Sequence, residues 1–125
     1  MVYRTEGVSV PAGLPLVILL TGFIDAGRAV AAYLDLVVVA IGGGGLAAGV
    51  AVAAKLRAKA RGKKVQVIGV QAENAASYVP SLRAGQPKQI DTRPTIADGI
   101  AVAKPGAIPF DLIKAHIDKV VTVSD

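Results

Sequence analysis

The chain has 125 residues, a length that predicts one domain with a single hydrophobic core. Apolar residues make up 53% of the sequence and charged residues only 18%, a balance that argues against intrinsic disorder. Cysteine is absent, which excludes disulfide bonds and thiolate metal sites.

The formal net charge is +5. The basic residues are dispersed apart from the stretch KLRAKARGKK (55–64), and aromatic residues do not interleave with them. This pattern favours a solvated basic helix end over a nucleic-acid interface. The apolar stretch 14–20 is too short to span a bilayer, and the sequence shows no secretion signal. We therefore expect a cytoplasmic protein without a nucleic-acid or membrane partner.

The first predicted elements are a strand, a short helix and a second strand. The continuous apolar run LVILL (16–20) predicts a strand that is buried on both faces. A turn follows, and a helix over 25–34 begins at Asp25, whose side chain is suited to cap its first turn. The next apolar run, LVVVAI (36–41), predicts a second buried strand.

A helix, a strand and another helix follow a run of four glycines. The content of Ala, Leu, Lys and Arg over 46–61 favours a helix with basic residues in its last turns. The run VQVIGV (65–70) predicts the third strand. Residues 75–85 predict a helix that is disturbed by Pro80 and closed by Gly85.

The remaining sequence predicts an irregular segment and one more helix–strand pair. Residues 86–108 are rich in Pro and Gly and are predicted to be irregular. A helix is predicted over 109–117, with Pro109 near its first turn, and a final strand over 119–123.

Strands that alternate with helices, and that are apolar along their length, indicate a parallel sheet with helices on both faces. Each crossover connection is expected to be right-handed. We therefore predict an α/β fold in a single domain over residues 1–125. Its architecture would be a three-layer sandwich with a small, mostly parallel sheet, flavodoxin-like or Rossmann-like.

Four consecutive glycines, Gly42, Gly43, Gly44 and Gly45, occupy the turn between the second predicted strand and the helix after it. Open α/β sheets bind ligands at such turns, where successive N–H groups and the helix dipole favour an anion such as phosphate. A tight turn with close helix–strand packing and no ligand explains the glycines equally well. The run is neither a Walker loop nor a GxGxxG fingerprint.

The segment from Asp35 to Asp125 resembles threonine dehydratases, which are pyridoxal-phosphate enzymes of the tryptophan-synthase-β-like fold type. The matching pieces are LVVVAIGGGGLAAGVA, VQVIGVQAENAASYVPSLRAG, TRPTIADGIAVAKPG and PFDLIKAHIDKVVTVSD. The resemblance implies that the four glycines bind the cofactor phosphate through backbone N–H groups. It also implies that ADGIA (97–101) runs near the cofactor ring.

Several parts of the dehydratase pattern are missing. The family's cofactor-binding lysine lies in a Ser-aromatic-Lys motif upstream of the glycine turn, whereas residues 1–41 contain no lysine. The Ser-x-Gly-Asn loop for the substrate carboxylate and the segment beyond VTVSD are also missing. Some relatives bind a divalent cation with carboxylates, but the matching positions here are Gln71 and Ser77. We therefore expect no catalytic residues and no metal ligands.

The first 34 residues resemble a different family. The stretch YRTEGVSVPAGLPLVILLTGFIDAGRAVAAYL is similar to the start of proteasome-assembly-chaperone-like proteins, in which PLVILLTGFIDAG forms a strand and a turn. The change of family falls near Tyr33–Asp35. We therefore interpret residues 1–34 as a first βα unit of different origin from the threonine-dehydratase-like segment 35–125, joined to it in an engineered or recombined chimera.

These observations lead to a functional hypothesis with two rivals. We expect a non-catalytic chimeric domain that requires no cofactor and has at most weak affinity for phosphate or pyridoxal phosphate at the glycine turn. The alternative is a fragment of a pyridoxal-phosphate-dependent threonine or serine dehydratase, a lyase that needs the missing segments for activity. A chaperone-like interaction element is the third reading. The rich apolar content and the uncovered sheet edges predict a homodimer.

Overall fold

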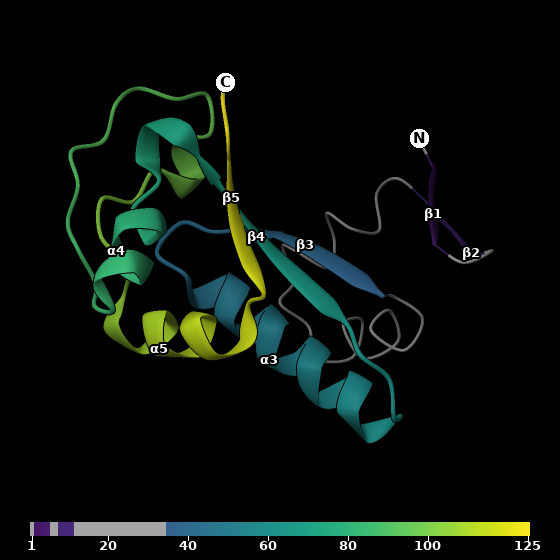
Figure 1. The fold of residues 1–125 in the computed structure, drawn as a ribbon. Helices are drawn as coiled ribbons and strands as arrows, with labels where there is room; N and C mark the ends of the chain where they lie inside the picture. The colour runs from purple at the N-terminus through teal and green to yellow at the C-terminus, as the bar shows by residue number, and fades with distance from the viewer. Residues whose placement is uncertain (1, 6–7, 12–34) are drawn as a thin grey trace.

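The computed structural model describes residues 2–5, 8–11 and 35–125 (Figure 1). The strand predicted over 16–20 and the helix predicted over 25–34 lie outside these described residues. Two short strands, β1 (Val2–Thr5) and β2 (Val8–Pro11), pair in antiparallel fashion. This two-stranded sheet was not among the elements predicted from the sequence.

The main sheet has three parallel strands in the order β3 (Leu36–Ala40), β4 (Gln66–Ala72) and β5 (Lys119–Val123). Their β-branched residues suit a pleated surface, and the register aligns Val70 of the central strand with Ala40 and Val121. This small parallel sheet with connecting helices confirms the predicted α/β class.

Helix α3 (Gly45–Ala60) connects the first two strands of this sheet, and helices α4 (Tyr78–Ala84) and α5 (Ala107–His116) connect the second to the third. The strand order advances in one direction, so two crossovers of the same hand place their helices on the same face. Helices α3 and α5 do contact each other, and Figure 1 shows them along one side of the sheet.

The hydrophobic core lies between that face of the sheet and helix α3. Alternate strand residues point inward, among them Val39 and Val67, which are 1% and 0% exposed. The helix meets them with a stripe of buried small side chains: Ala47, Ala48, Ala51, Ala54 and Ala58. Small side chains let the helix backbone approach the sheet closely, and Phe110 and Ile113 of α5 complete the cluster.

The opposite face of the sheet corrects the prediction that each strand is buried on both faces. Leu36, Val38 and Val123 are 43%, 54% and 52% exposed. Because both crossover helices lie on one face, the described residues supply no helix to cover these side chains. The outer face of the sheet, as we call it below, is therefore apolar and open within the described part of the chain.

The helix ends follow local sequence rules. Gly85 closes α4 in a left-handed conformation with φ 72°, as predicted. Pro80 lies in the first turn of α4, where its missing N–H costs nothing, so the helix continues through it. The helix predicted from residue 75 begins only at Tyr78, and Glu73–Ala75 ahead of it forms a short 3₁₀ turn. None of the described helices has the length and apolar character needed to cross a membrane.

Candidate functional site

The glycine turn lies at the carboxyl end of β3, where it opens helix α3. Gly44 has φ 104°, in the left-handed region that only glycine adopts without strain. Its carbonyl accepts the first helical hydrogen bond, from the N–H of Ala48 at 2.8 Å. The turn therefore requires glycine at this position for its backbone shape, whatever it binds.

The backbone N–H groups of this turn lack hydrogen-bond acceptors within the part of the chain that the structure describes. From Gly42 through Ala47, no described residue accepts a hydrogen bond from any of these N–H groups. They include the orphan donors of the first turn of α3, where the helix dipole adds a partial positive charge. Successive free N–H groups of this kind form a concave site for an anion.

The carbonyl of Gly43 is held from two sides. The hydroxyl of Tyr78 donates to it at 3.1 Å, and the N–H of Gly106, ahead of α5, donates at 3.0 Å. The Tyr78 side chain is fully buried and also packs against Gly44, since a Cβ at Gly44 would collide with its hydroxyl. Burial raises the pKa of this hydroxyl to about 12. No local sequence signal identifies Tyr78 as part of this turn, because its partner lies 35 residues away along the chain.

The segment predicted to run near the cofactor ring lies beside the turn. A Cβ added at Gly42 would be 3.2 Å from the Cα of Ile100 and 3.3 Å from Cγ2 of Val102. Ile100 ends a short 3₁₀ turn that begins at Asp98. The structure thus brings the glycine turn and the segment 97–101 together, so that a side chain at Gly42 would press on Ile100 and Val102.

Gln71 and Ser77, which the resemblance in sequence matches to a cation site, are both fully buried. The amide of Gln71 donates weakly to the carbonyls of Ile41 and Ala75, at 3.4 and 3.5 Å, and its oxygen accepts from the N–H of Tyr78 at 2.8 Å. A neutral amide that presents N–H donors to these carbonyls does not suit a divalent cation. The described residues also hold no group of three His, Cys, Asp or Glu side chains that could bind a metal.

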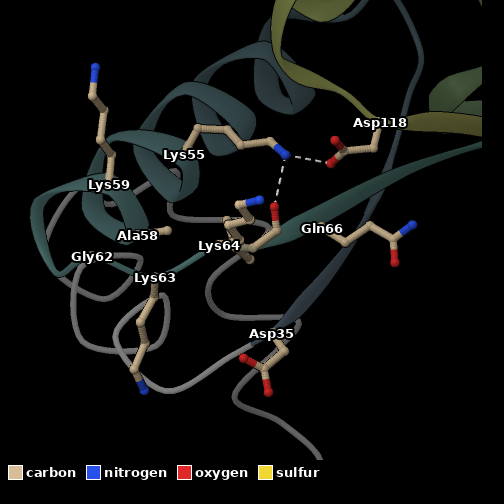
Figure 2. A pocket seen from close by; sticks show the side chains of 10 residues that line it. Asp35, Lys55, Ala58, Lys59, Gly62, Lys63, Lys64, Gln66 and Asp118 are labelled. Carbon is tan, nitrogen blue, oxygen red and sulfur yellow. Dashed lines mark hydrogen bonds and ion pairs between the residues drawn. The ribbon is translucent and has the colours of Figure 1, made fainter.

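A basic pocket of about 650 Å³ lies at the other end of the strands (Figure 2). Lys55 of α3 bridges its wall by donating to the carbonyl of Val65 at 2.8 Å and to the Asp118 carboxylate at 2.6 Å. The Lys55 ammonium, followed by the N–H of Val67, lowers the pKa of Asp118. We call this arrangement the Lys55–Asp118 clip.

Figure 2 shows the side chains of Lys59 and Lys63 pointing away from each other at this pocket. Ammonium groups that diverge do not converge on one ligand. The glycine turn, at the opposite end of the sheet from the basic pocket, is therefore the better candidate for a ligand-binding site.

Comparison with known proteins gives this geometry a family context. The sequence profile of the family described as "Pyridoxal-phosphate dependent enzyme" matches residues 21–125. Over 91 residues the chain is 47% identical to L-threonine ammonia-lyase of Thermotoga maritima and 40% identical to the catabolic L-threonine dehydratase TdcB of Escherichia coli. Each match covers 73% of this chain but only 22% and 26% of those proteins, so the chain spans about a quarter of their length.

Solved structures agree with the sequence matches. The processed form of threonine deaminase isoform 2 from Solanum lycopersicum superposes with a TM-score of 0.64 at 31% identity, covering 81% of this chain and 30% of that one. Maize serine racemase also gives a TM-score of 0.64, at 28% identity, covering 82% of this chain and 33% of that one. The three-stranded parallel sheet and its helices are therefore a fold that these proteins share.

Two predictions are corrected by these matches. The non-catalytic chimera is wrong: the family match begins at residue 21 and so crosses the predicted change of family near Tyr33–Asp35, and no comparison supports a chaperone-like segment over 1–34. The expectation that no cofactor is required is wrong as well, because the family that matches residues 21–125 is described as pyridoxal-phosphate dependent. By its fold and by a match over most of its length, the chain belongs to the family of pyridoxal-phosphate dependent enzymes.

Proposed function

We propose that Gly42–Gly45 and the N–H groups at the start of α3 bind the phosphate of pyridoxal phosphate. The observation that carries this proposal is the run of N–H groups from Gly42 to Ala47 without an acceptor among the described residues. A phosphate accepts several hydrogen bonds at once and carries the negative charge that a helix N-terminus favours. Glycine at each position keeps side chains out of the way of the ligand.

We propose further that the chain is part of a lyase that releases ammonia from threonine or serine. The support is its similarity to L-threonine ammonia-lyase and L-threonine dehydratase. The bound cofactor would supply the electron sink for breaking bonds at the amino acid's α-carbon. The chain's own contribution is to hold the phosphate, while Ile100 and Val102 pack against the turn at Gly42 and limit how far it can move.

The position of the lysines decides what the chain does alone. Residues 1–41 contain none, and the first lysine in the sequence, Lys55, is committed to the Lys55–Asp118 clip at the far end of the strands. By resemblance, the lysine that binds the cofactor precedes the glycine turn. We therefore expect this chain alone to bind pyridoxal phosphate through its phosphate group. We expect release of ammonia only when another segment supplies the lysine.

A second candidate is racemisation of serine, which the similarity to maize serine racemase favours. The two activities are separated by their products, since a lyase releases ammonia and a 2-oxo acid whereas a racemase returns the amino acid with inverted configuration.

Binding is tested by NMR with three ligands: inorganic phosphate, pyridoxal phosphate and pyridoxal. Phosphate and pyridoxal phosphate should shift the amide signals of Gly42–Ala47, and each should compete with the other. Pyridoxal lacks the phosphate and should leave those signals in place. Equal shifts with pyridoxal, or shifts centred on the basic pocket, would contradict the phosphate site.

The matched variants for this test are Gly42→Ala and Gly49→Ala. The methyl group at position 42 would press on the backbone of Ile100 at 3.2 Å and should weaken binding about tenfold. At position 49, an exposed place inside α3, an added methyl meets nothing within 4 Å and should leave binding unchanged. Activity is tested by adding this chain to the part of the Thermotoga maritima enzyme that precedes the matched segment and measuring ammonia release from threonine. No ammonia from a mixture that binds the cofactor would contradict the lyase proposal.

A further inference from the structure

The Gly43 carbonyl has its full complement of hydrogen bonds. A carbonyl oxygen accepts two, and this one receives the Tyr78 hydroxyl at 3.1 Å and the Gly106 N–H at 3.0 Å. The donors come from different parts of the chain, the start of α4 and the residue ahead of α5. Two elements that are separate in sequence therefore fix the direction of one carbonyl in the glycine turn.

Tyr78 is itself held rigidly. Its side chain is fully buried, and its ring lies 6.1 Å from that of Phe110 in a tilted arrangement. Its backbone N–H donates to the side-chain oxygen of Gln71 in the central strand at 2.8 Å. Burial raises the pKa of the hydroxyl to about 12, so at neutral pH it keeps the proton that it donates.

The direction of the carbonyl fixes the direction of the next N–H. A trans peptide is planar, and its C=O and N–H point to opposite sides. With the Gly43 oxygen turned toward Tyr78 and Gly106, the N–H of Gly44 points the other way, away from the buried tyrosine. Without these two donors, the peptide between Gly43 and Gly44 would be free to rotate, because glycine allows many backbone conformations.

We propose that Tyr78 is a positioning residue of the phosphate site, whose hydroxyl holds the Gly43–Gly44 peptide with the Gly44 N–H facing the ligand. This inference rests on the proposed phosphate binding, and it adds a residue that touches neither phosphate nor substrate. It also gives a reason for glycine at position 44 beyond its φ: the tyrosine hydroxyl occupies the space that a Cβ would need.

The test compares Tyr78→Phe with Ser81→Ala in the full chain. Tyr78→Phe keeps the ring and removes only the hydroxyl. The control removes another buried hydroxyl from the same helix, one that donates to the Ser77 carbonyl at 2.7 Å, accepts from the N–H of Lys88 at 2.8 Å, and makes no hydrogen bond to the glycine turn among the described residues. The dissociation constant for inorganic phosphate, measured by NMR with both variants fully folded, should rise about fivefold in Tyr78→Phe and stay unchanged in Ser81→Ala. An equal loss in both variants would overturn the proposal.

A second readout needs no ligand and separates this inference from the proposed function. In the ligand-free chain, the carbonyl ¹³C shift of Gly43 and the amide shift of Gly44 should move in Tyr78→Phe and stay in place in Ser81→Ala. In the wild-type chain, the Tyr78 hydroxyl proton should exchange slowly with water. If the wild-type chain fails to bind phosphate while these shifts move as expected, the proposed function is wrong. The hydrogen bond by which Tyr78 holds the Gly43–Gly44 peptide is then still supported. Unmoved Gly43 and Gly44 signals, or a hydroxyl that exchanges as fast as an exposed tyrosine's, would overturn the inference.

Discussion

At the scale of single residues, the described chain has polar contacts at two opposite ends of its sheet. Tyr78 uses its hydroxyl to orient backbone at the glycine turn, and Lys55 and Asp118 join α3 to the amino ends of two strands. The glycine turn was predictable from the sequence because four glycines between a strand and a helix are a local signal. Tyr78 was not predictable, since its role depends on a contact with Gly43 that only the folded chain creates.

The raised pKa of Tyr78 predicts a loss of stability in alkali. An unfolded tyrosine loses its proton near pH 10, whereas the buried hydroxyl holds it to about pH 12. The stabilisation is therefore complete below pH 10 and is lost as the pH rises from 10 to 12. Urea unfolding of wild type and Tyr78→Phe at several pH values should show a wild-type advantage that shrinks across this window. A constant difference between the two would argue against a buried, hydrogen-bonded hydroxyl.

The Lys55–Asp118 clip predicts a loss of stability in acid, whereas Tyr78 predicts one in alkali. The lowered pKa of Asp118 means that its contribution is present above about pH 4 and is lost as the pH falls through its folded-state value. Lys55→Met should cost about 1 kcal/mol of unfolding free energy at neutral pH and should flatten the fall in stability below pH 4. Lys59→Met, an exposed change on the same helix, should do neither. Chemical denaturation from pH 2 to 7 measures both variants.

At the scale of elements, periodicity predicted most of what the described residues form. The strand expected over 119–123 is found at those residues, and the helix expected over 46–61 is Gly45–Ala60. Apolar composition could not tell whether a strand is covered on one face or both. That property depends on which side the crossover helices take, and here α3 and α5 take the same side.

The buried alanines of α3 predict how the contact between helix and sheet responds to a larger side chain. Ala51 is fully buried against the sheet, so Ala51→Leu should force the helix outward and cost about 1–3 kcal/mol. Ala60, exposed at the end of the same helix, should accept leucine within about 0.5 kcal/mol. Thermal and urea unfolding of the two variants should differ accordingly. A similar loss from both would indicate that the helix is not packed as described.

At the scale of the whole molecule, the outer face of the sheet is the largest departure from expectation. The homodimer predicted from composition stays a prediction, and this face gives it a location. Val38 and Val123 lie on the two outer strands and are 54% and 52% exposed. Exposed apolar side chains in such a row favour association with a similar surface.

Self-association through this face has a direct test. We expect the wild-type chain to associate more as its concentration rises, and the double variant Val38→Lys/Val123→Lys to associate less, by light scattering and sedimentation. The control is Gln89→Lys/Thr92→Lys, which adds the same charge at exposed positions of the irregular segment. A wild-type chain that stays monomeric at millimolar concentration, or a control that lowers association equally, would refute the prediction.

The Lys55–Asp118 clip sits at the amino ends of the strands, whereas the glycine turn sits at their carboxyl ends. Acid tolerance and the proposed anion binding thus depend on groups at opposite ends of the strands, which share no atoms. Substitutions at exposed positions of the lysine-bearing end, such as Lys59, are therefore expected to leave the row of amide donors at the other end in place.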